Sequence, residues 1–176
     1  VGYAAIVFVP ERSDAGDTDD DAAAGERPAA DDDPSLGRAL LARARNAIAE
    51  TLGHATGPEP AHAGLDAPGA TFVTLRHRGE LRGCVGTLGA ERPLDQDVRQ
   101  HALAAAFDDR RFVPLASAEY GELQIEVSLL GEPEPLAAAS EAHALRQLRQ
   151  GRDGLVLEWR GRRATFLPQV WQQLPQ

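Results

Sequence analysis

The sequence contains a single cysteine, few aromatic residues and no long apolar run. One thiol cannot form an internal disulfide, so Cys84 acts through packing, nucleophilicity or metal binding. Aromatic residues make up only 5% of the chain, which disfavours stacking on RNA or DNA bases. No apolar stretch approaches the length of a transmembrane helix. We therefore expect a soluble, cytoplasmic protein in a reducing compartment that binds neither membrane nor nucleic acid.

Lysine and methionine are absent, and methionine is missing even at position 1. All 18 basic residues are therefore arginine. A chain without an initiating methionine is not an intact translation product, so we expect a processed form or a segment of a longer chain. At 176 residues, the sequence has room for one domain, or for one domain with tails.

Acidic charge is concentrated near the amino terminus. The net charge is −9. Residues 10–34 hold ten acidic residues and two arginines, a net charge of −8, which leaves −1 for the remainder. The folded body is therefore close to neutral. High charge and low hydrophobicity cannot offset the entropy lost on ordering, so we predict a disordered acidic linker over residues 11–34.

Apolar spacing predicts two helices and a half-buried strand in the central part of the chain. The first helix is expected to begin at Ser35 as its N-cap and to end at Gly53. The second runs from about 93 to 107. Between residues 123 and 129, apolar and polar side chains alternate, which is typical of a strand with one buried face.

Two hairpins are expected as well. In the first, a three-residue connection at 78–80 places Val73 opposite Val85, whereas a two-residue turn places Leu75 beside Arg82. We favour the first register because it keeps the apolar residues on one face. The second hairpin pairs 155–159 with 164–167, after a helix at about 139–150. These elements predict an α+β fold with an antiparallel sheet and flanking helices.

The segment LRGCVGTL, residues 81–88, surrounds the cysteine with two glycines. Glycine weakens a strand unless backbone or ligand must approach closely. In an extended segment Arg82 and Cys84 share a face, and a guanidinium there favours the thiolate. The other interpretation is a small buried core thiol, with glycines that ease a bulge. The residues alone leave both interpretations open.

This segment resembles the "LRGC(I/V)GT" signature of the AMMECR domain, which is called AmmeMemoRadiSam system protein A in prokaryotes. Further blocks resemble the same family in the same order: TFVTL at 71–75, AAAFDDRRFVPL at 104–115, EVSLL at 126–130, and a block at 151–170 that ends in LPQV. The similarity covers roughly residues 35–172. Four ordered blocks make chance similarity improbable.

The resemblance implies several further expectations. It implies an AMMECR domain over residues 35–176 with a larger and a smaller subdomain, and Memo-like and radical-SAM proteins as partners. Family members continue well past the LPQV block, so the usual C-terminal extension is expected to be absent. Residues 1–10 resemble the last strand of a Memo-like domain. We interpret them as a remnant of such an upstream domain, with an edge strand added to the sheet as the alternative.

Candidate site residues come from the motif and from the matching blocks. We propose Cys84 and Arg82 as catalytic residues, the thiol as nucleophile and the guanidinium as its positive partner. The expected ligand-binding residues are Gly83, Gly86, Thr87, Asp109, Arg111, Glu126 and Ser128. For Asp109 and Arg111, an ion pair between them is the preferred interpretation. Glu126 and Ser128 also fit the polar face of an ordinary strand.

No motif in the sequence names a reaction or a cofactor. Walker loops, dinucleotide-binding glycines, HExxH, CxxC and G-x-S-x-G are all absent. Metal binding by Cys84 is disfavoured because no spacing provides partner ligands. His54 and His62 are expected to be solvated loop residues, and His101 is expected to pack within its helix. Two functional hypotheses therefore remain. The protein is an enzyme or enzyme subunit that acts on a small molecule, or it is a non-catalytic binding module.

Overall fold

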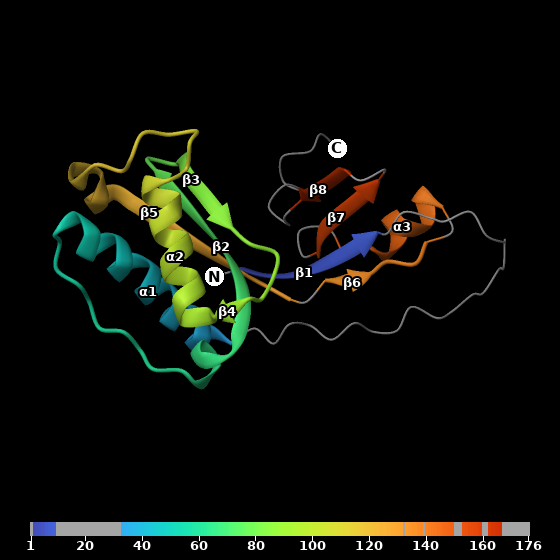
Figure 1. Ribbon diagram of the computed structural model, residues 1–176, viewed down its shortest axis with the longest axis horizontal. Helices are drawn as coiled ribbons and strands as arrows, with labels where there is room; N and C mark the ends of the chain where they lie inside the picture. Colours follow the sequence, from blue (N-terminus) through green and yellow to red (C-terminus); the bar gives the residue numbers. More distant parts are fainter. Residues whose placement is uncertain are drawn as a thin grey trace. The chain divides into compact units, whose positions relative to one another are not determined.

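The computed structural model describes residues 2–9, 33–131, 133–138, 140–149, 153–159 and 162–166. The chain divides into two compact units. The first contains Val1–Tyr3 and Asp32–Leu130, and the second contains Ala4–Asp31 and Gly131–Gln176. Both units mix helices with strands, so the predicted α+β class is confirmed (Figure 1). The predicted acidic linker lies outside the described residues, apart from its last two positions.

Helix α1 spans Pro34–Leu52, and its N-cap is Asp33 and not, as predicted, Ser35. The carboxylate of Asp33 accepts a hydrogen bond of 2.8 Å from the backbone N–H of Ser35. Pro34 occupies the first helical position, where its missing N–H removes no helical hydrogen bond. Aspartate therefore takes the capping role two residues earlier. The helix ends where predicted, because Gly53 adopts a left-handed φ of 74°.

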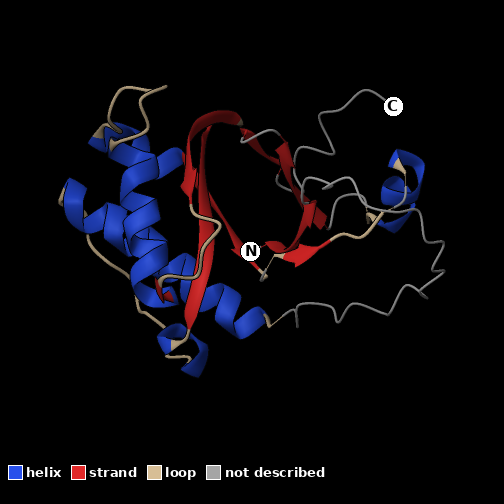
Figure 2. Cartoon of the chain, turned by 45° about the vertical axis from the view of Figure 1, so that its right-hand side comes forward, coloured by secondary structure: helices blue, strands red, loops and turns tan. Residues whose placement is uncertain are grey.

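The first unit is built on a three-stranded antiparallel sheet with the strand order β3-β2-β5. Its strands are β2 (Pro68–His77), β3 (Glu80–Gly86) and β5 (Leu123–Leu130). The short strand β4 (Arg92–Pro93) pairs with the start of β2 and leads into helix α2 (Leu94–Phe107). Two 3-10 turns, Ala63–Asp66 and Ser117–Glu122, complete the unit. Helices α1 and α2 lie on the same side of these strands (Figure 2).

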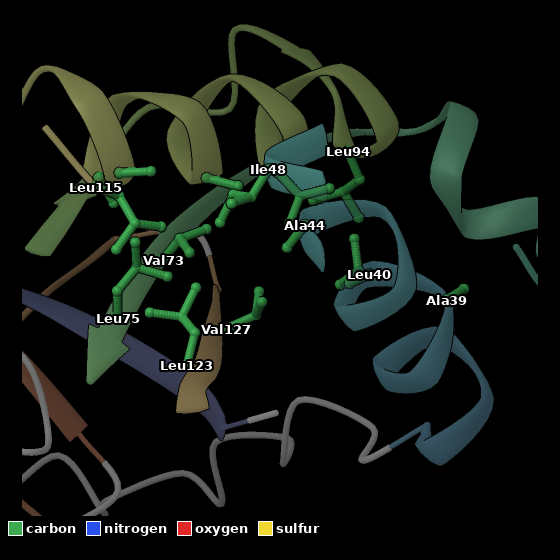
Figure 3. Close-up of a cluster of buried hydrophobic side chains, with 14 of the residues drawn as sticks. Ala39, Leu40, Ala44, Ile48, Val73, Leu75, Leu94, Leu115, Leu123 and Val127 are labelled. Carbon is green, nitrogen blue, oxygen red and sulfur yellow. The ribbon is translucent and has the colours of Figure 1, made fainter. Parts of the chain in front are cut away.

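The hydrophobic core lies between those two helices and the sheet. Leu40 and Ile48 of α1 are fully buried, and so are Val73 of β2 and Val127 of β5. Figure 3 shows their side chains meeting in this space. The apolar spacing in the sequence predicted these faces, because helices and strands bury side chains with periods of 3.6 and 2. The opposite face of the sheet is thus left for the polar positions of the strands.

A two-residue turn closes the hairpin between β2 and β3. Arg78 and Gly79 have φ values of 54° and 83°, and positive φ at both positions is characteristic of a type I′ turn. His77 consequently lies opposite Glu80. The predicted three-residue connection at 78–80 is therefore wrong.

A β-bulge at Arg82 nevertheless produces the predicted register farther along the hairpin. Arg76 pairs with Leu81, and Leu75 pairs with Gly83, so Arg82 has no partner on β2. One extra residue on one strand shifts all later pairs by one position. Val73 therefore lies opposite Val85, as predicted.

The second unit contains strand β1 (Gly2–Val9) from Ala4 onward, together with β6 (Glu134–Pro135), β7 (Asp153–Trp159) and β8 (Arg162–Phe166). β7 and β8 form the predicted antiparallel hairpin. Helix α3 (Glu141–Gln147), capped by Ser140, falls within the predicted helix at 139–150. β1 pairs in parallel with both β6 and β7. Val7 and Phe8 have partners on both strands, so β1 is not the edge strand of the alternative. Its origin in an upstream domain stays a prediction. The short helix expected around Trp171 lies outside the described residues.

Candidate functional site

The thiol of Cys84 lies on β3 directly opposite Thr74 of β2. The side chain is half-buried, and Thr74 Oγ1 lies 3.3 Å from Sγ and donates a hydrogen bond to it. The residue is not a member of the buried apolar cluster between the helices and the sheet. Cys84 is therefore a partly accessible thiol with a hydroxyl donor beside it.

Residues from three separate sequence blocks meet on this face of the sheet. Thr74 lies opposite Cys84 on one side and opposite Glu126 of β5 on the other. Residues that face each other across antiparallel strands place their side chains on the same face. The neighbouring row contains Gly86, Phe72 and Ser128. Four of the predicted site residues, Cys84, Gly86, Glu126 and Ser128, therefore share one face.

Asp109 and Arg111 bind the backbone of Cys84 from the outer side of β3. In the first unit β3 is an edge strand, so its outward N–H and C=O groups need partners other than a strand. The N–H of Cys84 donates to Asp109 Oδ2 at 2.9 Å. Its carbonyl oxygen accepts a hydrogen bond of 3.1 Å from Arg111 Nη2. The two side chains take the place of a neighbouring strand at this one residue.

The expected ion pair between Asp109 and Arg111 is present and has two branches. Arg111 Nε donates to Asp109 Oδ1 at 2.9 Å, and Nη2 donates to Oδ2 at 2.7 Å. The Arg111 guanidinium, with the N–H of Cys84, holds the pKa of Asp109 well below its usual range. Asp109 raises the pKa of Arg111 in turn, and the Cys84 side chain adds to that increase. Both groups are therefore charged at neutral pH.

Arg82 is engaged elsewhere. Its Nε donates to Glu119 Oε1 at 2.8 Å and its Nη2 to Oε2 at 3.1 Å. A further bond of 3.3 Å reaches the carbonyl oxygen of Pro114. Arg82 is the extra residue of the bulge, and a bulge redirects the side chain from the regular alternation. Among the contacts of the described residues, the guanidinium beside Cys84 is that of Arg111 and not, as expected, that of Arg82.

Both glycines of the motif are explained by close approach of other atoms. A Cβ at Gly83 would collide with the carbonyl oxygen of Ala105 on α2, and one at Gly86 would collide with Phe72. Gly83 therefore allows the helix to lie against the strand. Thr87 extends the pairing past the strand, with its N–H 3.2 Å from the carbonyl oxygen of Thr71.

The two loop histidines hold structure in place and are not simply solvated. His54 stacks on Tyr120 with ring centroids 4.5 Å apart, and its Nε2 lies 2.9 Å from Ser117 Oγ. His62 accepts a hydrogen bond from Gly64 N–H and lies 2.9 Å from Asp33 Oδ2. Each histidine therefore connects a loop to a neighbouring element, which the sequence did not indicate.

His101 packs as expected, but within a buried polar cluster. Asp97 Oδ2 accepts hydrogen bonds from the N–H and hydroxyl of Thr71 at 2.8 and 2.7 Å, and His101 Nδ1 lies 3.1 Å away. Burial raises the pKa of Asp97, but the bonds from His101 and Thr71 outweigh it, so the net shift is downward. Within the described residues, Oδ1 lacks a hydrogen-bond partner and no cluster could hold a metal ion. This cluster ties α2 to β2.

Sequence reasoning missed two residues of this region, Thr74 and Glu119. The expected hairpin register did place Thr74 on the same face as Cys84. The position of Thr74 in the strand could therefore have identified it as a neighbour of the thiol. Glu119 lies 37 positions from Arg82 in the sequence, and no local pattern connects the two.

None of the helices in the described part of the chain is long and apolar enough to cross a membrane.

Relatives from archaea align with most of the chain. A protein of Methanothermobacter thermautotrophicus is 38% identical over 140 residues, which cover 76% of this chain and 71% of the relative. A protein of Thermofilum pendens is 37% identical over 75% of this chain and 68% of its own length. A protein of Methanococcus aeolicus is 36% identical, and the match covers 58% of this chain but only 53% of that relative.

A solved structure and a family model agree with these matches. The crystal structure of an uncharacterised protein from Pyrococcus horikoshii superposes with a TM-score of 0.67 at 34% identity, over 76% of this chain and 70% of that one. The AMMECR1 family model matches residues 41–175. That range includes the cysteine motif and the three blocks that supply its neighbours. The chain therefore belongs to the AMMECR1 family.

Proposed function

We propose that this AMMECR-domain protein is an enzyme, or a subunit of one, that uses Cys84 as a nucleophile or substrate-binding thiol toward a small molecule. The ligand-binding face is formed by the rows that contain Thr74, Glu126 and Ser128. Family resemblance supports a role in the cytoplasm beside Memo-like and radical-SAM proteins.

The observation that carries the proposal is the environment of the thiol. Cys84 is half-buried outside the apolar core, and its sulfur receives a hydrogen bond from Thr74. On the outer side of β3, its backbone N–H is bound by Asp109 and its carbonyl oxygen by Arg111. Nucleophilic thiols need access, a fixed position and nearby donors or positive charge. A cysteine that only fills space needs none of these.

A non-catalytic binding or regulatory module with a structural Cys84 is the second candidate. The same backbone bonds favour it, because they also complete an exposed strand edge. The collision at Gly83 likewise shows that part of the motif serves packing. In this alternative the ligand, or a protein partner, binds the same face without forming a bond to sulfur.

The test is capture of small molecules from a cell extract by the immobilised full-length protein, followed by mass spectrometry. Cys84→Ser is the matched control, because serine keeps the size and can still accept the hydrogen bond of Thr74. We expect a ligand that wild type retains or converts and that Cys84→Ser binds without conversion. A ligand that both proteins bind equally, with no conversion by wild type in extract, favours the binding module.

A further inference from the structure

The guanidinium of Arg111 is held beside Cys84 by a closed ring of hydrogen bonds. Asp109 Oδ2 accepts from the N–H of Cys84 at 2.9 Å and from Arg111 Nη2 at 2.7 Å. Nη2 also donates to the Cys84 carbonyl oxygen at 3.1 Å. The second branch of the ion pair, from Nε to Oδ1, fixes the plane of the guanidinium. Arg111 therefore cannot leave Cys84 without breaking several bonds.

The two charges of this ion pair differ in their exposure to solvent. The Asp109 side chain is 7% exposed, whereas the Arg111 side chain is 56% exposed. A molecule that approaches from solvent therefore meets the cation first. The printed side-chain bonds of Arg111 to Asp109 and to the Cys84 carbonyl oxygen are donated by Nε and Nη2. Arginine stays protonated at any physiological pH.

Other charged groups near Cys84 offer a ligand less exposed charge. Asp109 binds the Cys84 N–H, but its side chain is 7% exposed against 56% for Arg111. Arg82 is bound to Glu119 by two hydrogen bonds. Glu126 is two strands away in the same row, roughly 10 Å at the usual strand spacing. Asp109 offsets part of the field of Arg111, but the guanidinium is the more exposed charge of the pair, so the solvent-facing side of this ion pair is positive.

We infer that Arg111 is the positive partner of the Cys84 thiolate and that the site selects thiol-reactive ligands that carry an anionic group, such as a carboxylate or phosphate. The inference rests on the proposed function, since it requires an accessible thiol. Asp109 is the positioning residue, because it acts through Arg111 and through the backbone of Cys84. The additional influence of the Cys84 side chain on the pKa of Arg111 agrees with this assignment.

Two alkylating reagents that differ in one charge test the inference. In both, the thiolate sulfur attacks the methylene carbon, an S–C bond forms, the C–I bond breaks and iodide leaves. Iodoacetate is an anion and iodoacetamide is neutral. Mass spectrometry gives the rate constants of both reagents with the native full chain, and we take the ratio of iodoacetate to iodoacetamide. Dividing this ratio by the same ratio for the chain in denaturant gives a normalised ratio. The normalised ratio reports the electrostatic field at Cys84.

We expect this normalised ratio to favour iodoacetate for wild type at low salt, up to the limit of about fivefold that one unpaired charge at contact distance in water gives. Arg111→Gln should lower it to one or below, because the carboxylate of Asp109 remains beside Cys84. Arg111→Lys should retain part of it, and the matched control Arg82→Gln should leave it unchanged. In wild type alone, the ratio should fall toward one at about 1 M salt, a measurement that needs no folded variant.

An unchanged ratio in Arg111→Gln, or a wild-type ratio near one at low salt, would overturn the inference while Cys84 still reacts. Failure of native Cys84 to react with either reagent would overturn the proposed function instead. The two failures are thus distinguishable in one experiment.

Discussion

Arg82 and Glu119 are joined by two parallel hydrogen bonds of 2.8 and 3.1 Å. The pair is well shielded, since the side chains are 12% and 23% exposed. It connects the bulge of β3 to the 3-10 turn before β5. We therefore expect Arg82→Gln to lower the free energy of unfolding by about 2 kcal/mol. The alkylation rate of Cys84 in the folded variant should stay within about twofold of wild type. A selective loss of thiol reactivity would restore Arg82 as the catalytic partner.

The same pair predicts how stability depends on acidity. The hydrogen bonds that Glu119 accepts from Arg82 are the largest cause that lowers the pKa of Glu119 from 4.5 to about 2. Between these values the unfolded chain binds more protons than the folded chain, so stability is complete above about pH 4.5 and falls as the pH decreases. Urea unfolding at a series of pH values should show this slope. Glu119→Gln should reduce it, and an identical slope in the variant would contradict the assignment.

Gly83 is expected to tolerate no side chain. A Cβ there would meet backbone, the carbonyl oxygen of Ala105 on α2, and backbone cannot rotate away. Gly83→Ala should therefore destabilise the protein by about 2 kcal/mol or more, in the range of overpacked cores. Gly121→Ala is the matched control, because a Cβ at Gly121 meets nothing within 4 Å. Thermal unfolding of both variants measures the difference, and equal melting temperatures would refute the close packing.

The buried carboxylate of Asp97 should contribute more to the free energy of unfolding than an exposed carboxylate does. Its Oδ2 accepts two hydrogen bonds from Thr71 and lies 3.1 Å from His101 Nδ1. Asp97→Ala leaves these donors unsatisfied, so we expect a loss of about 2 kcal/mol or more. Asp66→Ala changes an exposed aspartate and should be nearly neutral. Comparable unfolding midpoints for the two variants would show that the cluster does not stabilise the contact between α2 and β2.

Local patterns in the sequence predicted most of the first unit. Spacing located the helices and the strand at Leu123–Leu130, because each buries one face with a fixed period. Two details were wrong, for separate physical reasons. Asp33 took the cap expected of Ser35. A turn with positive φ at Arg78 and Gly79, combined with a bulge, replaced a longer connection.

The candidate site was only half predictable. The family blocks named Cys84, Asp109 and Arg111, which the structure brings together by hydrogen bonds, and alternation placed Glu126 on a polar face; their roles as site residues stay a prediction. The roles of the two arginines were beyond the sequence, because a bulge redirects Arg82 and because Asp109 and Arg111 bind the backbone of Cys84 at the edge of β3. Such contacts depend on tertiary geometry. The position of Arg82 close to Cys84 in the motif therefore did not show which guanidinium binds at Cys84.

The central claim is that Cys84 is an accessible thiol and not a core residue. Iodoacetamide labelling of the native full chain, followed over time by intact mass, tests it most directly because the chain has only this one cysteine. We expect complete labelling of native protein at pH 8 at a rate within about tenfold of that in denaturant, since the side chain is half-buried. Labelling that occurs only after denaturation would contradict the claim and show that the thiol serves packing.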